Sequence, residues 1–417
     1  MDNFELAWPF RTLNYLGRNF PIDLSEDSLL DKACRHTGLT DWGDNSFRTG
    51  LRVLLEADEH EAELSSIGRM MVRYDYLRIL TNRLRIEAAF RRDPAILAHP
   101  VRQPVFIIGF PRTGTTLLHN LLAQDPQTRV PMMWELMWAP PLDKRSDPRI
   151  RWAKQGIQVT YALMPKMRFM HPLHATGPEE CLFLLANDFA CLEFEVQRYI
   201  PSYVSWFFKQ DLVPVYESFR RQVQLLHSQM PGERWVLKSP FHLPALDALL
   251  KVFPDACLIH PHRDPAEVVP SMCSITNVVR KTHSRRVDSQ RLGRDWLDTW
   301  GTAMSRAMHV RATADPKRFF DIDYRELVCE PLMAVQRLYS YLGWSFTPGV
   351  SARMADWLSR NTQHKHGTHQ YTLEQFGVTR GMVDDRFADY IKTYGCGRLA
   401  WKKKIGVNMP VTPDSTS

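Results

Sequence analysis

Hydrophobic residues follow two different periods along the chain, and the change between them falls near residue 100. In the first part, apolar residues recur at helical spacing among many Arg, Glu and Leu residues, which predicts helices at 26–37, 46–67 and 69–92. After it, short apolar runs bounded by polar or turn residues predict strands at 105–108, 235–237, 256–259 and 319–322. A helical pattern follows each run, so we expect an α/β fold with a parallel sheet flanked by helices.

The same patterns predict the organisation of the chain. We expect residues 1–100 to form an N-terminal helical cap that ends near His99-Pro100. Residues 101–417 then form an α/β domain of P-loop type. Between the first two strands lies a long insertion, at about 127–232, which is crowded with Met, Trp, Phe, Tyr and Pro.

The first strand runs into a glycine-rich loop that carries the clearest chemical signal. Residues 109–116 read G-x-x-x-x-G-T-T, a Walker A pattern in which Thr115 takes the place of the lysine. Gly109 and Gly114 let the backbone bend around an anion, and the helix that begins at Thr115 presents free N–H groups to it. A cation stands inside the loop instead, at Arg112. The loop therefore predicts a phosphate site that differs from that of a kinase.

Composition and charge set wider bounds. With 417 residues, 44% of them hydrophobic and 24% charged, the chain is typical of a folded globular protein. A net charge of +7 favours anionic ligands only mildly, since a solvated basic surface is the commoner cause of such a charge. The charge is less lopsided than in nucleic-acid-binding domains, so we expect no nucleic acid partner.

Cysteine usage and the N-terminus indicate the compartment. The seven cysteines are scattered and form no C-x-x-C pair, which argues against disulfides and thiolate zinc sites. The first ten residues lack the basic start and apolar core of a signal peptide, and no apolar stretch is long enough to span a bilayer. We therefore expect a cytoplasmic protein without a transmembrane segment.

Polar side chains follow the second and third strands where each ends. Arg263 is followed eight positions later by Ser271, about two turns along a helix that we expect to begin at Asp264-Pro265. Arginine and hydroxyl suit a second phosphate, although an arginine that caps or salt-bridges at a strand end is the plain alternative.

The second strand ends in Lys238, with His242 four positions later. Because the carboxyl ends of parallel strands share one crevice, we expect both side chains to face the loop at 109–116. There a lysine can neutralise charge and a histidine can accept a proton. A histidine at a helix start with a local hydrogen bond is the alternative.

Taken together, residues 111–116, the Lys238-Ser239-Pro240 segment and the Arg263…Ser271 pair resemble a known family. They are similar to the 5′-phosphosulfate loop, the central lysine segment and the 3′-phosphate motif of sulfotransferases that use 3′-phosphoadenylyl sulfate (PAPS). The pattern resembles the bacterial-type branch, which is itself similar to tyrosylprotein sulfotransferases. Tyr324, in Tyr-Arg-Glu-Leu, is similar to the residue that lies beside the adenine. The likeness covers roughly 104–345.

The resemblance implies roles for these residues. The phosphosulfate would be held by the loop, through Arg112, Thr113, Gly114, Thr115 and Thr116. Arg263 and Ser271 would hold the 3′-phosphate. Lys238 would stabilise charge on the bridging or leaving oxygen. Sulfuryl transfer from PAPS needs no magnesium, which accounts for the missing Walker lysine, so we expect no metal.

The catalytic base stays open. Cytosolic sulfotransferases place their histidine two residues after the lysine, whereas His242 follows Lys238 by four. The tyrosylprotein branch uses a glutamate shortly after the loop helix, and Glu135 falls near that position. Glu179 and Glu180 are further candidates.

Three features of the sequence, two near the C-terminus and one in the centre, are ambiguous. The Arg-Lys-Gly element of the cytosolic branch has no counterpart here, and Lys365, His366 and Tyr371 are candidate substitutes near the 3′-phosphate. His364, His366 and His369 lack a neighbouring carboxylate or cysteine to complete a metal site, so we favour a phosphate-facing or solvated segment. The basic run at 280–294 has no interleaved aromatic residue for base stacking, which leaves a mobile lid or a solvated face.

The insertion bears on the acceptor. Its Met and aromatic residues must mostly form core, but as a group they favour a hydrophobic alcohol or phenol as the acceptor. We therefore predict an enzyme that transfers a sulfuryl group from PAPS to the hydroxyl of a small molecule. A P-loop small-molecule kinase and a non-catalytic nucleotide-binding protein are the alternatives; the sequence leaves the oligomeric state unknown.

Overall fold

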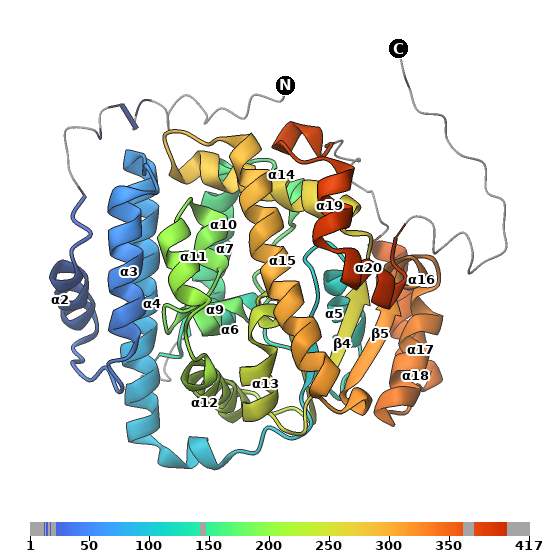
Figure 1. Ribbon diagram of the computed structural model, residues 1–417. Coiled ribbons are helices and arrows are strands. Elements are labelled where there is room, and N and C mark those ends of the chain that lie inside the picture. The colour runs from blue at the N-terminus through green and yellow to red at the C-terminus, as the bar shows by residue number, and fades with distance from the viewer. Residues whose placement is uncertain are drawn as a thin grey trace.

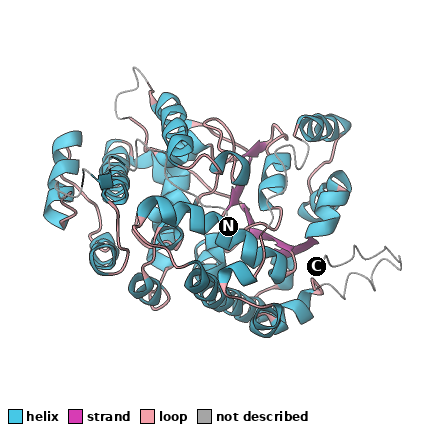
Figure 2. Cartoon of the chain, turned by 90° about the horizontal axis from the view of Figure 1, so that it is seen from above, coloured by secondary structure: helices cyan, strands magenta, loops and turns pink. Residues whose placement is uncertain are grey.

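A computed structural model provides the structure of the protein. It describes residues 22–141, 147–361 and 371–397, together with Thr12, Asn14, Tyr15 and Gly17. Within these residues, helices far outnumber strands, and the helices lie on both sides of one central sheet (Figure 2).

The sheet has five parallel strands in the order β2-β3-β1-β4-β5. Its strands are β1 Val105–Ile107, β2 Thr128–Arg129, β3 Arg234–Lys238, β4 Cys257–His262 and β5 Phe319–Asp323. The four predicted strands and the parallel α/β fold are confirmed. The edge strand β2 was missed, because two residues are too few for any periodicity to register.

Alternation along β1 explains why the sheet is covered on both faces. Val105 and Ile107 belong to one apolar cluster with residues of α5 (Thr115–Leu122), α17 (Pro331–Leu342) and α18 (Pro348–Arg360). Phe106 belongs to another, with residues of α12 (Val213–Gln229), α13 (Leu246–Val252) and α15 (Ser289–Thr313). Successive side chains of a strand point to opposite faces, so a strand that is apolar throughout needs cover on both. Because both faces of the sheet are buried, a site on the sheet is expected at the carboxyl ends of its strands.

The N-terminal helices are α2 Glu26–Thr37, α3 Phe47–His60 and α4 Ser66–Arg92, at the left of Figure 1. The three predicted helices are thus confirmed, but the second ends at His60 and not at residue 67. It ends early because Ser65 caps α4, its hydroxyl accepting the Gly68 N–H at 3.0 Å.

These helices share a hydrophobic cluster with the insertion. Arg83 on α4 pairs with Asp188 at 2.7 Å, and both side chains are buried. Tyr76 packs edge-on against Phe189, with ring centroids 5.6 Å apart. The N-terminal helices therefore support the insertion, which in turn lies against the edge of the sheet that carries the site.

The insertion and the sheet contribute the remaining helices. Those of the insertion are α6 Met133–Met137, α7 Arg149–Leu163, α8 Met167–Met170, α9 Leu182–Ala186, α10 Glu193–Gln197, α11 Pro201–Phe207 and α12 Val213–Gln229. Those that flank or follow the strands are α5 Thr115–Leu122, α13 Leu246–Val252, α14 Pro265–His283, α15 Ser289–Thr313, α16 Tyr324–Cys329, α17 Pro331–Leu342, α18 Pro348–Arg360, α19 Arg380–Arg386 and α20 Ala388–Tyr394. Across the described residues, no helix combines the length and the apolar character that crossing a membrane requires.

Candidate active site

The loop after β1 has the backbone geometry of an anion cradle. Gly109 and Gly114 have φ of 118° and 84°, and Arg112 between them has φ of 67°, all in the left-handed region. A Cβ on Gly109 would lie 3.0 Å from the His260 ring, so the loop packs directly on β4. Helix α5 begins at Thr115, immediately after the αL turn at Gly114, and its first N–H groups face into the loop.

The structure brings the two predicted cation sites together. The Arg112 guanidinium donates to the Ser271 hydroxyl at 3.2 Å and to the carbonyl of Met170 at 3.1 Å. Arg263 donates to the backbone carbonyl of Arg112 at 2.8 Å. The predicted cap is confirmed, because the Asp264 carboxylate accepts the Ala266 N–H at 3.0 Å at the start of α14.

Tyr324 lies against the same loop. The Arg263 guanidinium stacks over its ring at 4.2 Å from the centroid. A Cβ on Gly114 would approach the Tyr324 ring to 3.2 Å, so the ring and the loop are in near contact. An aromatic face and an arginine thus stack on each other beside the glycine-rich loop.

Lys238 at the end of β3 reaches the start of α5. Its ammonium lies 2.7 Å from a Glu180 carboxylate oxygen and donates to the Thr116 hydroxyl at 3.3 Å. The Lys238 side chain is 2% exposed and that of Glu180 is 14% exposed. A charged lysine and a carboxylate therefore meet at the loop, with limited access of water.

Glu179 is the deeper of the two neighbouring glutamates. One of its oxygens accepts the Glu180 N–H at 2.9 Å and lies 3.8 Å from His171 Nε2. Burial raises the pKa of Glu179, but the neighbouring His171 ring, the charge of Lys238 and the Glu180 N–H outweigh the effect of burial and lower the pKa to about 2. Glu179 is therefore an anion that anchors the 177–180 turn beneath Glu180.

Glu135 lies in a different environment. It is buried, one carboxylate oxygen pairs with Arg129 at 2.5 Å, and the other accepts the Met132 N–H at 2.9 Å as the cap of α6. Both oxygens are thus already committed. Glu135 was one of the candidate bases in the sequence; in the structure its contacts tie α6 to the edge strand β2.

His242 was expected to face the loop together with Lys238, but its ring is enclosed in the apolar interior. It is fully buried within a short 3₁₀ turn; Nδ1 lies 2.7 Å from the Tyr216 hydroxyl and Nε2 lies 3.1 Å from Cys181 Sγ. Burial lowers its pKa to about 3. The ring packs edge-on against Phe106, 5.2 Å between centroids.

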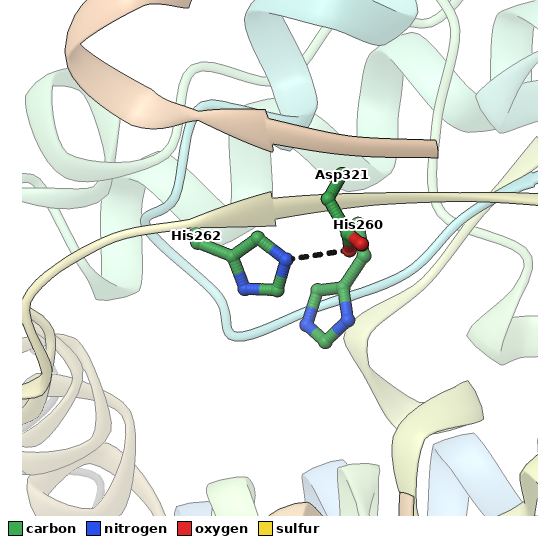
Figure 3. Close-up of side chains that lie close together, drawn as sticks. All are labelled: His260, His262 and Asp321. Carbon is green, nitrogen blue, oxygen red and sulfur yellow. Dashed lines mark hydrogen bonds and ion pairs between the residues drawn. The ribbon is translucent and has the colours of Figure 1, made fainter. Parts of the chain in front are cut away.

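Among the described residues, one side-chain group has the composition of a metal site. The ligand atoms of His260, His262 and Asp321 all lie within 4.8 Å of one another (Figure 3). Arg311, however, donates to both Asp321 oxygens at 2.8 Å and lies 2.9 Å from His260 Nδ1. The guanidinium thus takes the place that a metal ion would need.

Some residues singled out in the sequence lie outside the described residues, and one lies in a different environment from the one expected. Lys365, His366 and the other two histidines at 364 and 369 lie outside the described residues. In the basic run, Arg280 is neither in a lid nor solvated: it is buried and pairs with Glu195. Sequence reasoning missed His171 and Tyr390, because no local spacing relates either residue to the loop or to Arg263.

Comparison with known proteins agrees with this geometry. The sequence profile of the sulfotransferase family matches residues 104–348, which contain β1 to β5 and the whole loop. The chain belongs to the sulfotransferase family. It is therefore an enzyme that transfers a sulfuryl group, on the P-loop-type fold that the sequence predicted, and its resemblance to the bacterial-type branch is confirmed.

This sulfotransferase is similar to characterised mycobacterial proteins. It is 28% identical over 315 residues to the omega-hydroxy-β-dihydromenaquinone-9 sulfotransferase Stf3 of Mycobacterium tuberculosis, covering 73% of this chain and 77% of that one. The crystal structure of sulfotransferase STF1 from M. tuberculosis H37Rv matches with 33% identity and a TM-score of 0.78, covering 88% of this chain and 98% of that one. The crystal structure of sulfotransferase STF9 from Mycobacterium avium matches with 29% identity and a TM-score of 0.83, covering 91% of this chain and 98% of that one.

Proposed function

We propose that this sulfotransferase takes its sulfuryl group from PAPS and transfers it to the hydroxyl of a hydrophobic small molecule. One observation carries the choice of donor: two arginines, Arg112 and Arg263, converge from separate strand ends on one loop. The two guanidinium groups meet there, since Arg263 donates to the Arg112 carbonyl and Arg112 donates to the Ser271 hydroxyl. A donor with phosphates at both the 5′ and the 3′ position needs two such cation sites.

The residues of the loop would hold the donor. Thr115, Thr116 and the first N–H groups of α5 would bind the 5′-phosphosulfate, and Arg112 would neutralise it. Arg263 and Ser271 would bind the 3′-phosphate, with Tyr324 beside the base. Arginine and lysine then supply the positive charge, so we infer that the transfer needs no metal ion.

We assign the general base to Glu180. Its carboxylate is partly accessible and lies 2.7 Å from the Lys238 ammonium at the mouth of the loop. It would accept the proton of the acceptor hydroxyl as the new O–S bond forms and the S–O bond to the 5′-phosphate breaks. Lys238 would stabilise the negative charge that develops on the oxygen leaving sulfur, and the desulfated nucleotide PAP would be released with that charge.

The other candidate bases are better suited to structural roles. His242 has both ring nitrogens in contact with Tyr216 and Cys181, and its pKa of about 3 would make it a weak base at neutral pH. Glu135 uses both oxygens to hold Arg129 and the start of α6. We therefore propose that His242 and Glu135 position neighbouring elements.

The residues of the insertion indicate the class of acceptor molecule. Helix α8 meets the loop where the Met170 carbonyl accepts from Arg112, and Met164, Met167 and Met170 belong to one buried apolar cluster there. Methionine side chains adapt to irregular apolar ligands. A relative of this chain acts on omega-hydroxy-β-dihydromenaquinone-9, a hydroxylated lipid. We infer an acceptor of the same general kind, an alcohol on an apolar molecule.

The test is calorimetric binding of PAP against ADP, with and without magnesium, on the wild type and on Arg263→Ala. We expect a preference for PAP that does not depend on magnesium and collapses in the variant. Binding of ADP alone, and only with magnesium, would refute PAPS as the donor. Binding of PAP without transfer of sulfate to any apolar alcohol would refute the proposed class of acceptor.

A further inference from the structure

The junction between β4 and α14 is held from outside by the two C-terminal helices. This junction consists of His262, Arg263 and Asp264. The Tyr390 hydroxyl on α20 lies 3.0 Å from Nδ1 of His262, the residue before Arg263. Arg380 on α19 pairs at 3.1 Å with the carboxylate of Asp264, the residue after it. The two residues that flank Arg263 therefore have partners on α20 and α19.

The contact at Tyr390 is the end of a directed chain of hydrogen bonds. His262 Nε2 lies 2.7 Å from an Asp321 oxygen (Figure 3). Arg311 donates to both oxygens of the same carboxylate. Because Asp321 only accepts, His262 Nε2 carries the hydrogen, and Nδ1 must accept one from the Tyr390 hydroxyl. The Tyr390 hydroxyl therefore fixes His262, the residue next to Arg263 in the chain.

The side chain of Arg263 is also constrained. Its Nη1 donates to the Arg112 carbonyl at 2.8 Å, and its Nε donates to Glu267 at 2.9 Å. With these anchors, the direction of the guanidinium depends on where the backbone of residue 263 lies. A planar fork of donors binds a phosphate well only when it is correctly aligned, so a shift of the junction would misalign it.

We propose that Tyr390 and Arg380 are positioning residues that hold Arg263 in place for the 3′-phosphate of the donor. This inference rests on the proposed use of PAPS. Helices α19 and α20 begin after residue 348, beyond the part of the chain that the family profile matches. The C-terminal helices thus contribute to donor recognition through the backbone of Arg263, without contacting the donor themselves.

The experiment compares two nucleotides that differ only in the 3′-phosphate, PAP and 5′-AMP, by calorimetry on Tyr390→Phe. Loss of one oriented hydrogen bond predicts a fall in PAP affinity of roughly five- to tenfold, with AMP affinity unchanged. Tyr339→Phe is the matched control: its hydroxyl is also buried and donates to Asp125 at 2.9 Å, but it belongs to the opposite apolar cluster. PAP affinity of this control should equal that of the wild type.

A double-variant cycle tests whether Tyr390 acts through Arg263. In an Arg263→Ala background, Tyr390→Phe should cost no further PAP affinity, because the group that it positions is gone. Additive losses, or equal losses for PAP and AMP, would overturn the inference. Arg380→Gln, on a half-exposed side chain, provides the same test if Tyr390→Phe does not fold.

The outcomes separate this inference from the donor assignment. A wild type that binds PAP no better than AMP would refute the use of PAPS itself. A wild type that prefers PAP, with the preference intact in both Tyr390→Phe and Arg380→Gln, would refute only the positioning role of the C-terminal helices.

Discussion

Replacing Glu180 by glutamine tests the assignment of the base most directly. In the wild type, the Lys238 ammonium lies 2.7 Å from a Glu180 carboxylate oxygen. The amide keeps the shape of the side chain and an oxygen that can still accept from Lys238. It removes the negative charge and the ability to take a proton. Glu180→Gln should therefore leave the fold and the position of Lys238 intact while it removes the proposed chemistry.

The magnitude follows from the two roles of this carboxylate. A positioned general base contributes about 10²–10⁴-fold to turnover, and we expect kcat to fall about 10²–10³-fold. Since each factor of ten equals about 1.4 kcal/mol, the loss of transition-state stabilisation is about 3–4 kcal/mol. PAP affinity should stay the same or rise slightly, because the Lys238 ammonium loses an anion that competes with the donor.

The assay measures kcat by sulfate transfer to an apolar alcohol and PAP affinity by calorimetry, on the same preparations. Glu135→Gln is the matched control, since it makes the same change at a nearby glutamate whose oxygens are committed to Arg129 and Met132. If Glu180→Gln keeps kcat within threefold of the wild type, or loses PAP affinity in parallel, then Glu180 is not the base.

Three further predictions concern stability and the loop. Glu135→Gln should keep kcat but lose about 1–3 kcal/mol of unfolding free energy, seen in urea titration, because a buried charged hydrogen bond to Arg129 weakens; unchanged stability would contradict this. The pKa of Glu179 is about 2, against 4.5 for the unpaired group. The ionised carboxylate therefore stabilises the fold above pH 4.5, and this stabilisation is lost as the pH falls towards 2. The Tm gap between wild type and Glu179→Gln should therefore narrow over that window; a constant gap would refute the ion pair. Gly114→Ala, at φ 84° with Leu327 only 3.0 Å from the added carbon, should cost about 1–2 kcal/mol in the same urea titration and weaken PAP binding; wild-type values would mean that the loop adapts.

The sequence predicted the framework of the site because that framework is local. A buried strand that ends in a glycine-rich turn and a helix start are all encoded within 105–118, and the loop, Lys238 and Arg263 each follow directly from a strand end. In a parallel sheet, strand ends meet at one edge, so their proximity could be predicted without coordinates. The Asp264-Pro265 helix start was predictable for the same reason.

The choice among bases depended on contacts between distant segments. His242, Glu135 and the Glu179/Glu180 pair were all candidates in the sequence, and only burial and partners separate them. His242 contacts Tyr216, 26 positions away, and Glu180 reaches Lys238, 58 positions away. No period or spacing in one segment records which partner another segment will bring.

By itself, then, the sequence determined the class of fold and predicted the glycine-rich loop and the pair of cation sites, because backbone propensities and strand-end geometry act over a few residues. The tertiary structure alone decided which carboxylate stays accessible beside Lys238, and that the C-terminal helices clamp the junction at Arg263. Accessibility and charge pairing arise from packing across the whole chain. A glutamate whose two oxygens both have partners, such as Glu135, anchors neighbouring elements. A glutamate whose side chain stays partly accessible, such as Glu180, is a candidate base.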